Sequence, residues 1–437
     1  MLAIVFTFAL TLGACGGANA PATDAGGETP SSGDSGGSGS SGGPGGDTIK
    51  IGYVNPISGP LASLSIGGKS AAFIFDEAYK VINDERGGID IGGKKMKVEI
   101  IWGDSESDPT KAQEVATKLV TQDNVDMLLG CWTPATTGPV SAVGERYNVP
   151  TVAAVGPDIS WLPGGPYEWV FGIAFDYDKF NDEYFNGWDK MDTNKKIGLA
   201  LDSSIDSVGM ADIVKQKAAE RGYTIVDPGR YPEGTMDYMQ ILTQIQNEGC
   251  DIFVASTVTP EIVTIWNQCN QLGYIPKTAV LSKGMHAAVD VLSLGEDMGV
   301  GVCIETMWSP QFPWANSING KSARELSDDF ESALDISADF GLGLEWALAE
   351  VSYDALTRAG SLDPEAIRQA LKDTNLVTSD GRVVFDDDHV GCVPIVFGQW
   401  VRDDKWGYKK VIVSADHTPE VTQLTPPVYI PGYTSGN

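Results

Sequence analysis

Residues 125–155 read VDMLLGCWTPATTGPVSAVGERYNVPTVAAV. Aliphatic residues dominate both ends, at 125–131 and 149–155, which predicts two short buried strands. The segment between them predicts a helix that ends near Tyr147. A strand, a helix and a second strand in this order form the repeating unit of a parallel sheet that carries helices on its faces.

The same alternation extends toward the N-terminus. The elements expected there are strands at 49–54 and 97–102 and helices at 68–83 and 110–121. The helix near residue 110 is the best marked, because Asp108 can cap it and Pro109 suits its first turn. This half of the chain therefore predicts one doubly wound α/β unit.

A second α/β unit of similar size follows. Its expected elements are strands at 196–201, 224–226, 252–255 and 278–281 and helices at 210–221, 236–248 and 260–272. The tail adds helices at 322–334, 343–359 and 364–372, then β-rich stretches at 382–385 and 393–413. We expect these last elements to complete both units.

Composition excludes several classes of function. The chain has 437 residues, of which 42% are hydrophobic, so it can bury more than one core. The chain has 30 Lys and Arg and 59 Asp and Glu, which give a net charge of -29. This charge disfavours nucleic acid as a partner. The three histidines, His286, His389 and His417, are far apart, and no HExxH or Cys-x-x-Cys occurs, so we expect no metal site.

The N-terminus predicts export. Residues 1–15 form an apolar run that ends in Leu12-Gly13-Ala14-Cys15, which resembles a lipoprotein signal peptide with its lipobox, although no Lys or Arg precedes the run. The acylated Cys15 would then anchor the chain to the membrane. Residues 16–47 are rich in Gly and Ser and predict a flexible linker.

The folded region resembles a known family. The matching residues are Ile51-Gly52-Tyr53-Val54, Ser58-Gly59-Pro60, NDERGGI at 83–89, the run 93–100 with Asp104, Gly130-Cys131-Trp132-Thr133, and 382–400 with Phe385-Asp386 and Phe397-Gly398-Gln399-Trp400. They resemble type I periplasmic solute-binding proteins of the branched-chain amino acid and urea/amide transporters. The resemblance covers about residues 48–413.

The resemblance implies an α/β fold of two doubly wound lobes joined by three crossovers, near Ala174, Glu305 and Asn375. Lobe 1 would comprise 48–174 and 306–375, lobe 2 would comprise 175–305 and 376–415, and 416–437 would be a tail. It also implies a monomer without cofactors, lipid-anchored outside the bacterial cell membrane. This subunit of an ABC importer would bind a small polar solute, such as an amino acid, amide or carboxylate, and deliver it to permease and ATPase subunits.

Ligands of such sheets bind at the carboxyl ends of the strands. In lobe 1 the resemblance assigns solute contacts to two loops. The assigned residues are Trp132, Thr133, Ala135 and Thr136 in the first loop and Asp158, Ile159 and Ser160 in the second. Pro134 stands where relatives often have Ser, so the amide of Ala135 and the Thr hydroxyls must supply the donors. Trp132 fits either a rim residue or a flat apolar wall, and Asp158 could instead cap the next helix.

In lobe 2 the sequence departs from the amino-acid binders. Val258 and Thr259 stand where those proteins commonly carry an aromatic residue, and Lys283 stands where they commonly carry a Glu. A Lys would attract a carboxylate, so we infer a solute with an acidic group. The alternative is a solvated Lys283 or one paired with Asp206, which is itself a candidate contact.

Two other classes compete with the binding protein. A secreted hydrolase would need a nucleophile with a base or paired carboxylates, and the folded region has no G-x-S-x-G, so we expect no enzyme. A ligand-sensing receptor for a signalling partner stays an alternative. The cysteines other than Cys15 are Cys131, Cys250, Cys269, Cys303 and Cys392. Buried thiols or one or two disulfides both fit this odd number, and Cys250 with Cys269 is the first pair to test.

Overall fold

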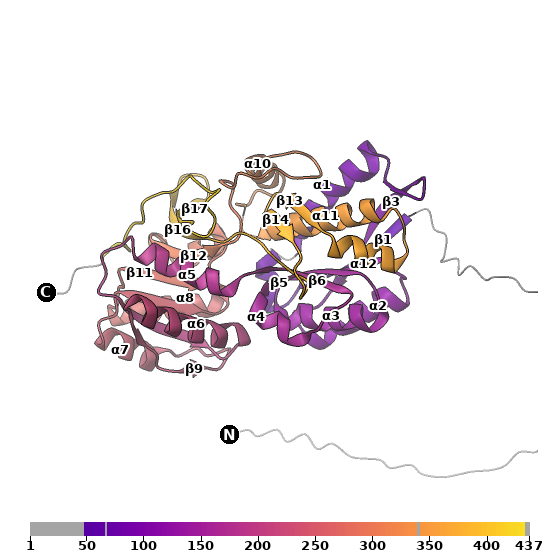
Figure 1. The fold of residues 1–437 in the computed structure, drawn as a ribbon. Helices are drawn as coiled ribbons and strands as arrows, with labels where there is room; N and C mark the ends of the chain where they lie inside the picture. Colours follow the sequence, from indigo (N-terminus) through magenta and orange to yellow (C-terminus); the bar gives the residue numbers. More distant parts are fainter. Residues whose placement is uncertain (1–47, 66–67, 339–340, 433–437) are drawn as a thin grey trace, which may run out of the picture. The chain divides into compact units, whose positions relative to one another are not determined.

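The computed structural model describes residues 48–65, 68–338 and 341–432. The expected signal peptide, the lipobox Cys15 and the linker at 16–47 lie outside the described residues. The described part contains two large sheets, each flanked by helices, and a two-stranded sheet (Figure 1). The expected α/β class with parallel, doubly wound sheets is confirmed.

The first sheet has the strand order β15-β6-β5-β4-β1-β3-β2. Its strands are β1 (Thr48–Asn55), β2 (Ile89–Ile91), β3 (Lys94–Asp104), β4 (Met127–Cys131), β5 (Thr151–Pro157), β6 (Val170–Phe175) and β15 (Val390–Cys392). The helices after these strands are η1 (Pro60–Ser65), α1 (Lys69–Lys80), η2 (Val81–Glu85), α2 (Pro109–Thr121), α3 (Pro134–Tyr147), α4 (Asp158–Trp161) and η3 (Leu162–Gly164). The predicted cap of α2 is confirmed, because the Asp108 side chain accepts a hydrogen bond from the Lys111 amide.

The second sheet has the order β17-β16-β12-β11-β10-β7-β8, and β9 pairs with β7. Its strands are β7 (Lys196–Asp202), β8 (Thr224–Val226), β9 (Arg230–Tyr231), β10 (Ile252–Ser256), β11 (Thr278–Ser282), β12 (Val302–Thr306), β16 (Val396–Asp403) and β17 (Gly407–Ser414). Its helices are α5 (Tyr177–Trp188), α6 (Ile205–Arg221), α7 (Met239–Asn247), α8 (Thr259–Leu272) and α9 (Ala288–Leu292). The inner strands β10 and β11 are buried throughout, as expected for a parallel sheet covered on both faces.

The tail returns to the first sheet before it completes the second. It contains α10 (Ala323–Leu334), α11 (Gly341–Ala359), α12 (Pro364–Lys372) and the hairpin β13 (Asn375–Thr378) and β14 (Gly381–Val384). Phe330 of α10 packs edge-on against Phe73 of α1, with ring centroids 5.4 Å apart, and α11 contacts α1 and β5. The segment from α10 to β15 therefore belongs with the first sheet.

The chain passes between the sheets three times. The first two crossings, after β6 and after β12, lie beside the expected Ala174 and Glu305. The third lies between β15 and β16, at 393–395, and not near Asn375 as the sequence predicted. β15 pairs with β6, so residues 376–392, which were expected in lobe 2, lie in lobe 1. The β-rich sequence of the tail does not indicate with which sheet each of its strands pairs.

Residues 416–432 contain no helix or strand, but they pack against the second lobe. The Gln399 side chain accepts a hydrogen bond from the Val428 amide and donates one to the Val428 carbonyl, and Ile430 is buried. Among the described residues, no helix has both the length and the apolar character needed to cross a bilayer. Cys250, Cys269, Cys303 and Cys392 are free thiols, so the suspected Cys250–Cys269 disulfide does not form.

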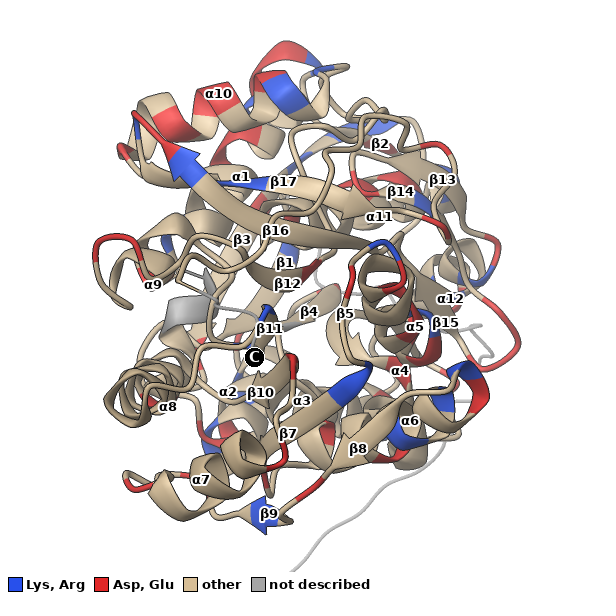
Figure 2. Cartoon of the chain, turned by 90° about the vertical axis from the view of Figure 1, so that its left-hand side faces the viewer, with Lys and Arg blue, Asp and Glu red and all other residues tan. Residues whose placement is uncertain are grey.

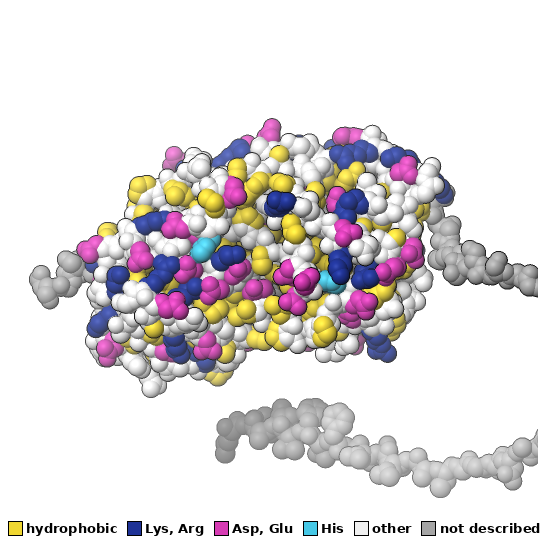
Figure 3. Space-filling view, viewed as in Figure 1, with side chains coloured by type: hydrophobic (Ala, Val, Ile, Leu, Met, Phe, Trp, Pro, Cys, Tyr) yellow, Lys and Arg dark blue, Asp and Glu magenta, His cyan; other side chains and the backbone are white. Residues whose placement is uncertain are grey.

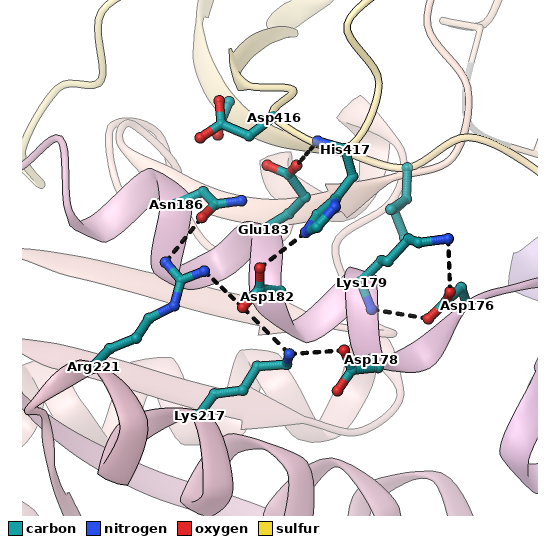
Figure 4. Close-up of polar contacts among 12 residues, drawn as sticks. Asp176, Asp178, Lys179, Asp182, Glu183, Asn186, Lys217, Arg221, Asp416 and His417 are labelled. Carbon is teal, nitrogen blue, oxygen red and sulfur yellow. Dashed lines mark hydrogen bonds and ion pairs between the residues drawn. The ribbon is translucent and has the colours of Figure 1, made fainter.

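A charge network joins α5 to α6 and to the C-terminal segment (Figure 4). The carboxylate of Asp182 contacts Arg221 at 2.7 Å, Lys217 at 3.3 Å and His417 Nε2 at 2.9 Å. Burial acts to raise the pKa of Asp182, but these hydrogen bonds and positive charges outweigh it and lower the pKa. Elsewhere, acidic and basic side chains are interspersed over the surface (Figures 2 and 3).

Candidate functional site

One cleft is walled by both lobes and by the crossings between them. Lobe 1 contributes Trp132, Thr133, Pro134, Gly156, Pro157 and Leu344, the first two crossings contribute Phe175, Tyr177, Phe180, Glu305 and Met307, and lobe 2 contributes Asp206, Ser256, Ser282, Lys283 and His286. The cleft encloses about 80 Å³. It lies at the carboxyl ends of β4, β5, β7, β10, β11 and β12, as expected for this class of sheet.

The loop after β4 begins a helix at the cleft. Thr133 is the N-cap of α3, and its side chain makes no capping hydrogen bond. Pro134 occupies the first turn and has no N–H, so the exposed Ala135 supplies the first free amide of the helix. Thr136 is buried, and its hydroxyl donates to the Thr133 carbonyl at 3.2 Å. Of the predicted residues here, Thr133 and Trp132 lie in the wall, whereas Ala135 and Thr136 are not lining residues.

The loop after β5 does not present its predicted residues to the cleft. Asp158 accepts hydrogen bonds from the amides of Ile159 at 2.7 Å and Tyr177 at 3.1 Å, so the carboxylate serves the backbone. Burial raises its pKa. Ser160 lines a separate surface cavity beside α3. Ile159 is 41% exposed and reaches across to Gly209 of α6. The backbone at Gly156 and Pro157 lines the cleft instead.

In lobe 2, Lys283 and Asp206 form an ion pair. Lys283 Nζ lies 3.5 Å from Asp206 Oδ2, and both side chains are largely buried. The pairing that the sequence left as an alternative is thus the one present, and it neutralises most of the positive charge that the anionic-solute inference relied on. The other oxygen, Asp206 Oδ1, is buried and accepts no hydrogen bond. Such an oxygen is a vacant acceptor for a ligand donor.

The remaining candidates of lobe 2 support the loops. The Thr259 hydroxyl donates to the Gly284 carbonyl at 2.8 Å, which fixes the loop that carries Lys283. Val258 is the N-cap residue of α8. Neither lines the cleft, whereas Ser256, the last residue of β10, does.

The sequence interpretation missed a buried network around Glu305. Glu305 is 4% exposed, and Tyr184 donates to its Oε2 at 2.7 Å. The hydroxyl of Ser282 and the amide of Lys283 donate to Oε1 at 2.9 and 3.2 Å. Burial raises the pKa of Glu305. The position of Glu305 at the carboxyl end of a strand is the sequence signal for a site residue, but the sequence analysis identifies Glu305 only as a crossing point.

The apolar part of the wall was also missed. Phe175, Tyr177 and Phe180 flank the first crossing, with ring centroids 5.1 to 6.2 Å apart, and the rings of Phe175 and Phe180 are stacked. The Tyr177 hydroxyl donates to the Asp206 carbonyl at 2.9 Å, which places this ring beside the ion pair. Phe175 ends a strand, and Tyr177 and Phe180 lie three residues apart in α5, a spacing that the sequence pattern does not distinguish from an ordinary core face.

The connectivity of the polar groups differs from that of a hydrolase. Ser282 Oγ and His286 Nε2 both approach Glu305 Oε1, at 2.9 and 3.5 Å. In a catalytic triad the imidazole lies between the nucleophile and the acid. Burial and the charge of Lys410 lower the pKa of His286, which favours the neutral ring. The arrangement can hold polar groups of a ligand, and it shows no activated nucleophile among these residues.

Comparison with known proteins agrees with this geometry. The family model described as periplasmic binding protein matches residues 48–405. The Leu/Ile/Val-binding protein homolog 8 of Brucella abortus is 26% identical to this chain over 267 residues. The matched region covers 58% of this chain and 63% of the relative. The chain thus matches less than two thirds of that relative's length.

Two solved structures share the fold. The isoleucine-bound substrate-binding protein of a branched-chain amino acid transporter from Streptococcus pneumoniae superposes with a TM-score of 0.69, at 22% identity, over 84% of this chain and 99% of that one. A solute-binding protein from Rhodopseudomonas palustris, in complex with 3,4-dihydroxybenzoic acid, gives 0.68 at 18% identity, over 89% of this chain and 100% of that one. The chain belongs to the periplasmic binding proteins, and its fold is that of the type I members.

Proposed function

We propose that this protein is the extracytoplasmic, lipid-anchored solute-binding subunit of an ABC importer, and that it delivers its solute to a membrane permease. The family membership supports capture of a small molecule, and the lipobox-like Leu12-Gly13-Ala14-Cys15 supports the anchor. The linker at 16–47 would let the two lobes reach a permease from that anchor.

The solute that the cleft fits best is a small organic acid with a hydrogen-bond donor at its other end, such as an amino acid or a hydroxylated aromatic acid. The observation that carries this class is the pairing of an acceptor with donors in one cleft: Asp206 Oδ1 is buried without a partner, and Lys283 lies beside it. On lobe 1, Thr133 at the start of α3 lines the cleft, and a helix N-terminus favours a carboxylate. The rings of Trp132, Phe175 and Phe180 suit the apolar body of such a molecule.

Capture would proceed by lobe closure. A solute shifts the balance between open and closed forms only by its differential affinity for them, and a shift from mostly open to mostly closed requires on the order of 5 kcal/mol. Contacts from both lobes would supply that difference, because Thr133 of lobe 1 lines the same cleft as Asp206 and Lys283 of lobe 2. The closed form would then be recognised by the permease.

The test is a thermal-shift screen of the full chain against amino acids, amides, urea, and aliphatic and aromatic carboxylates. A true solute at a hundred times its dissociation constant adds about 2.7 kcal/mol of stability. We expect an organic acid to give the largest shift, and Asp206→Asn to reduce it. Stabilisation by none of these compounds, or turnover of a compound by the protein, would contradict the proposed function.

A further inference from the structure

We propose that the protein has a second small-molecule site, which lies behind the second crossing and takes a small aromatic carboxylate with a hydrogen-bond donor. The site, here called the rear pocket, is defined by Trp308 and Gln311 after β12, Arg324 and Glu331 on α10, and Trp406 and Lys409 on the β16–β17 hairpin. It encloses about 240 Å³, against about 80 Å³ for the cleft.

The segment that follows β12 lines both the rear pocket and the cleft. Met307 lines the cleft and the next residue, Trp308, lines the rear pocket. The two cavities therefore share this crossing as a common wall. The rear pocket is also walled by both lobes, since α10 belongs with the first and β16 and β17 with the second (Figures 1 and 2).

Residues with polar atoms that have no hydrogen-bond partner among the described residues line the rear pocket. Trp308 is 1% exposed, and its Nε1 is buried without a hydrogen bond. The same is true of Trp406 Nε1 and of Gln311 Oε1. Buried polar groups are normally satisfied, so two orphan donors and one orphan acceptor in one cavity indicate a ligand with complementary groups. The indole N–H groups suit a carboxylate, and Gln311 suits an amine or hydroxyl.

The charges and rings select the same class. Arg324, Lys409 and Lys410 line the cavity, and Glu331 is the acidic residue among its lining residues. Lys409 Nζ lies 3.4 Å from Asp403 Oδ1, outside the lining. Glu331 is engaged at the rim, where its Oε2 lies 2.7 Å from Lys405 Nζ. The pocket is thus locally cationic in a chain with a net charge of -29. Among the lining rings, Trp400 and Tyr408 are buried, whereas Trp406 is partly exposed, with Lys405 Nζ 4.6 Å from its ring centroid. The Trp406 ring can therefore contact an aromatic ligand.

The shared wall couples the two sites. Rotation of the lobes about the crossings moves groups on opposite sides of the pivot in opposite directions, so widening the cleft narrows the rear pocket. A molecule in the rear pocket therefore favours the narrow cleft, and it raises the affinity for the solute by about five-fold or more. The coupling is reciprocal, because it is a difference in free energy between the same two lobe arrangements.

The experiment is hydrogen–deuterium exchange on the full chain with 4-aminobenzoate, which carries a ring, a carboxylate and an amine. We expect slower exchange of amides at 308–311 and 406–411. Gln311→Leu should abolish that protection and weaken binding about ten-fold, since it removes the only acceptor orphaned among the described lining residues. Lys409→Gln should weaken binding, and Lys111→Gln, on the distant α2, should not.

The outcomes separate this site from the cleft. Protection at 132–137 and 282–286 alone, or no protection at all, overturns the rear pocket as a site for this class. Protection at the rear segments that Gln311→Leu leaves unchanged overturns it as well. Trp308→Phe, which keeps a ring and removes the N–H, gives a second variant if Gln311→Leu does not fold. The thermal-shift screen can fail while the rear pocket stands, and the reverse also holds.

Discussion

Met307 and Trp308 are neighbours in the chain, yet they line two different cavities beside the second crossing. The crossing therefore lines two cavities as well as connecting the lobes. It is the wall that a solute in the cleft and a molecule in the rear pocket both contact. Any movement of this segment changes both cavities at once, and this single relationship connects the proposed function with the further inference.

The ion pair in the cleft predicts a charge-dependent preference. Lys283→Glu places two carboxylates side by side with Asp206 and removes the cation, so an acidic solute found in the screen should bind about ten- to hundred-fold more weakly. Isothermal titration calorimetry measures the change. Lys111→Glu, an exposed reversal on α2, is the control for net charge. Equal affinity of wild type and Lys283→Glu for that solute would show that Lys283 takes no part in binding.

A buried carboxyl predicts how stability depends on pH. The Asp380 side chain is fully buried in the β13–β14 turn, and neither of its carboxylate oxygens has a hydrogen-bond partner among the described residues. Burial raises the pKa of Asp380, and the negative charge of Glu350 raises it further. Its folded pKa exceeds the unfolded value of 3.8, so the folded form holds an extra proton and loses stability as pH rises above about 4. Burial likewise raises the pKa of Glu350, to about 7.

Asp380→Asn removes this titration. The free energy of unfolding of the variant, relative to wild type, should therefore increase with pH, by on the order of 1 kcal/mol per pH unit within the window. Urea unfolding at pH 5 and pH 8 measures it. Asp387→Asn, in the exposed turn before β15, should show no such trend. A difference that is the same at both pH values would mean that Asp380 is ionised in the folded protein.

The charge network of Figure 4 predicts a pH dependence of stability opposite to that of Asp380. Asp182→Asn leaves the largely buried Lys217 and the guanidinium of Arg221 with weaker partners, so stability at pH 7 should fall by about 1 to 3 kcal/mol. The lowered pKa of Asp182 means that its contribution is present above the unfolded pKa of 3.8 and is lost as pH falls through the folded pKa. The deficit of the variant should shrink in acid.

Asp178→Asn is the matched control for Asp182→Asn. Asp178 contacts the same Lys217 at 2.9 Å, but its side chain is 64% exposed. Surface ion pairs contribute little, so this variant should lose less than about 1 kcal/mol. If the two variants lose equal stability, the network does not depend on Asp182 as its centre.

The free thiols predict resistance to alkylation. Cys250, Cys269 and Cys303 are buried, and burial raises the pKa of Cys250 and of Cys303 to about 11, so little thiolate forms at pH 8. Mass spectrometry after iodoacetamide treatment should find these three unmodified in the native protein and modified in urea. A reducing agent should leave the thermal midpoint unchanged. A Cys250–Cys269 crosslink in the purified protein would contradict the structure.

Some of the candidate site followed from sequence order alone. Trp132, Thr133 and Lys283 come directly after predicted strands, and Asp206 lies near the start of the helix that follows another strand. The carboxyl ends of parallel strands meet at one edge, so all four lie in the cleft wall. Asp158 and Ser160 also follow a strand, but neither lines the cleft. The Asp158 carboxylate accepts hydrogen bonds from two backbone amides, and Ser160 lines a separate cavity.

The sequence by itself determined the α/β class and the repeated strand–helix units, because hydrophobic periodicity and capping residues act over a few neighbours. Only the tertiary structure decided that Glu305, Tyr177 and Met307 complete the cleft, that β15 joins the first sheet, and that Lys283 meets Asp206. Those outcomes depend on how distant segments approach, and the local pattern of residues carries no record of that distance.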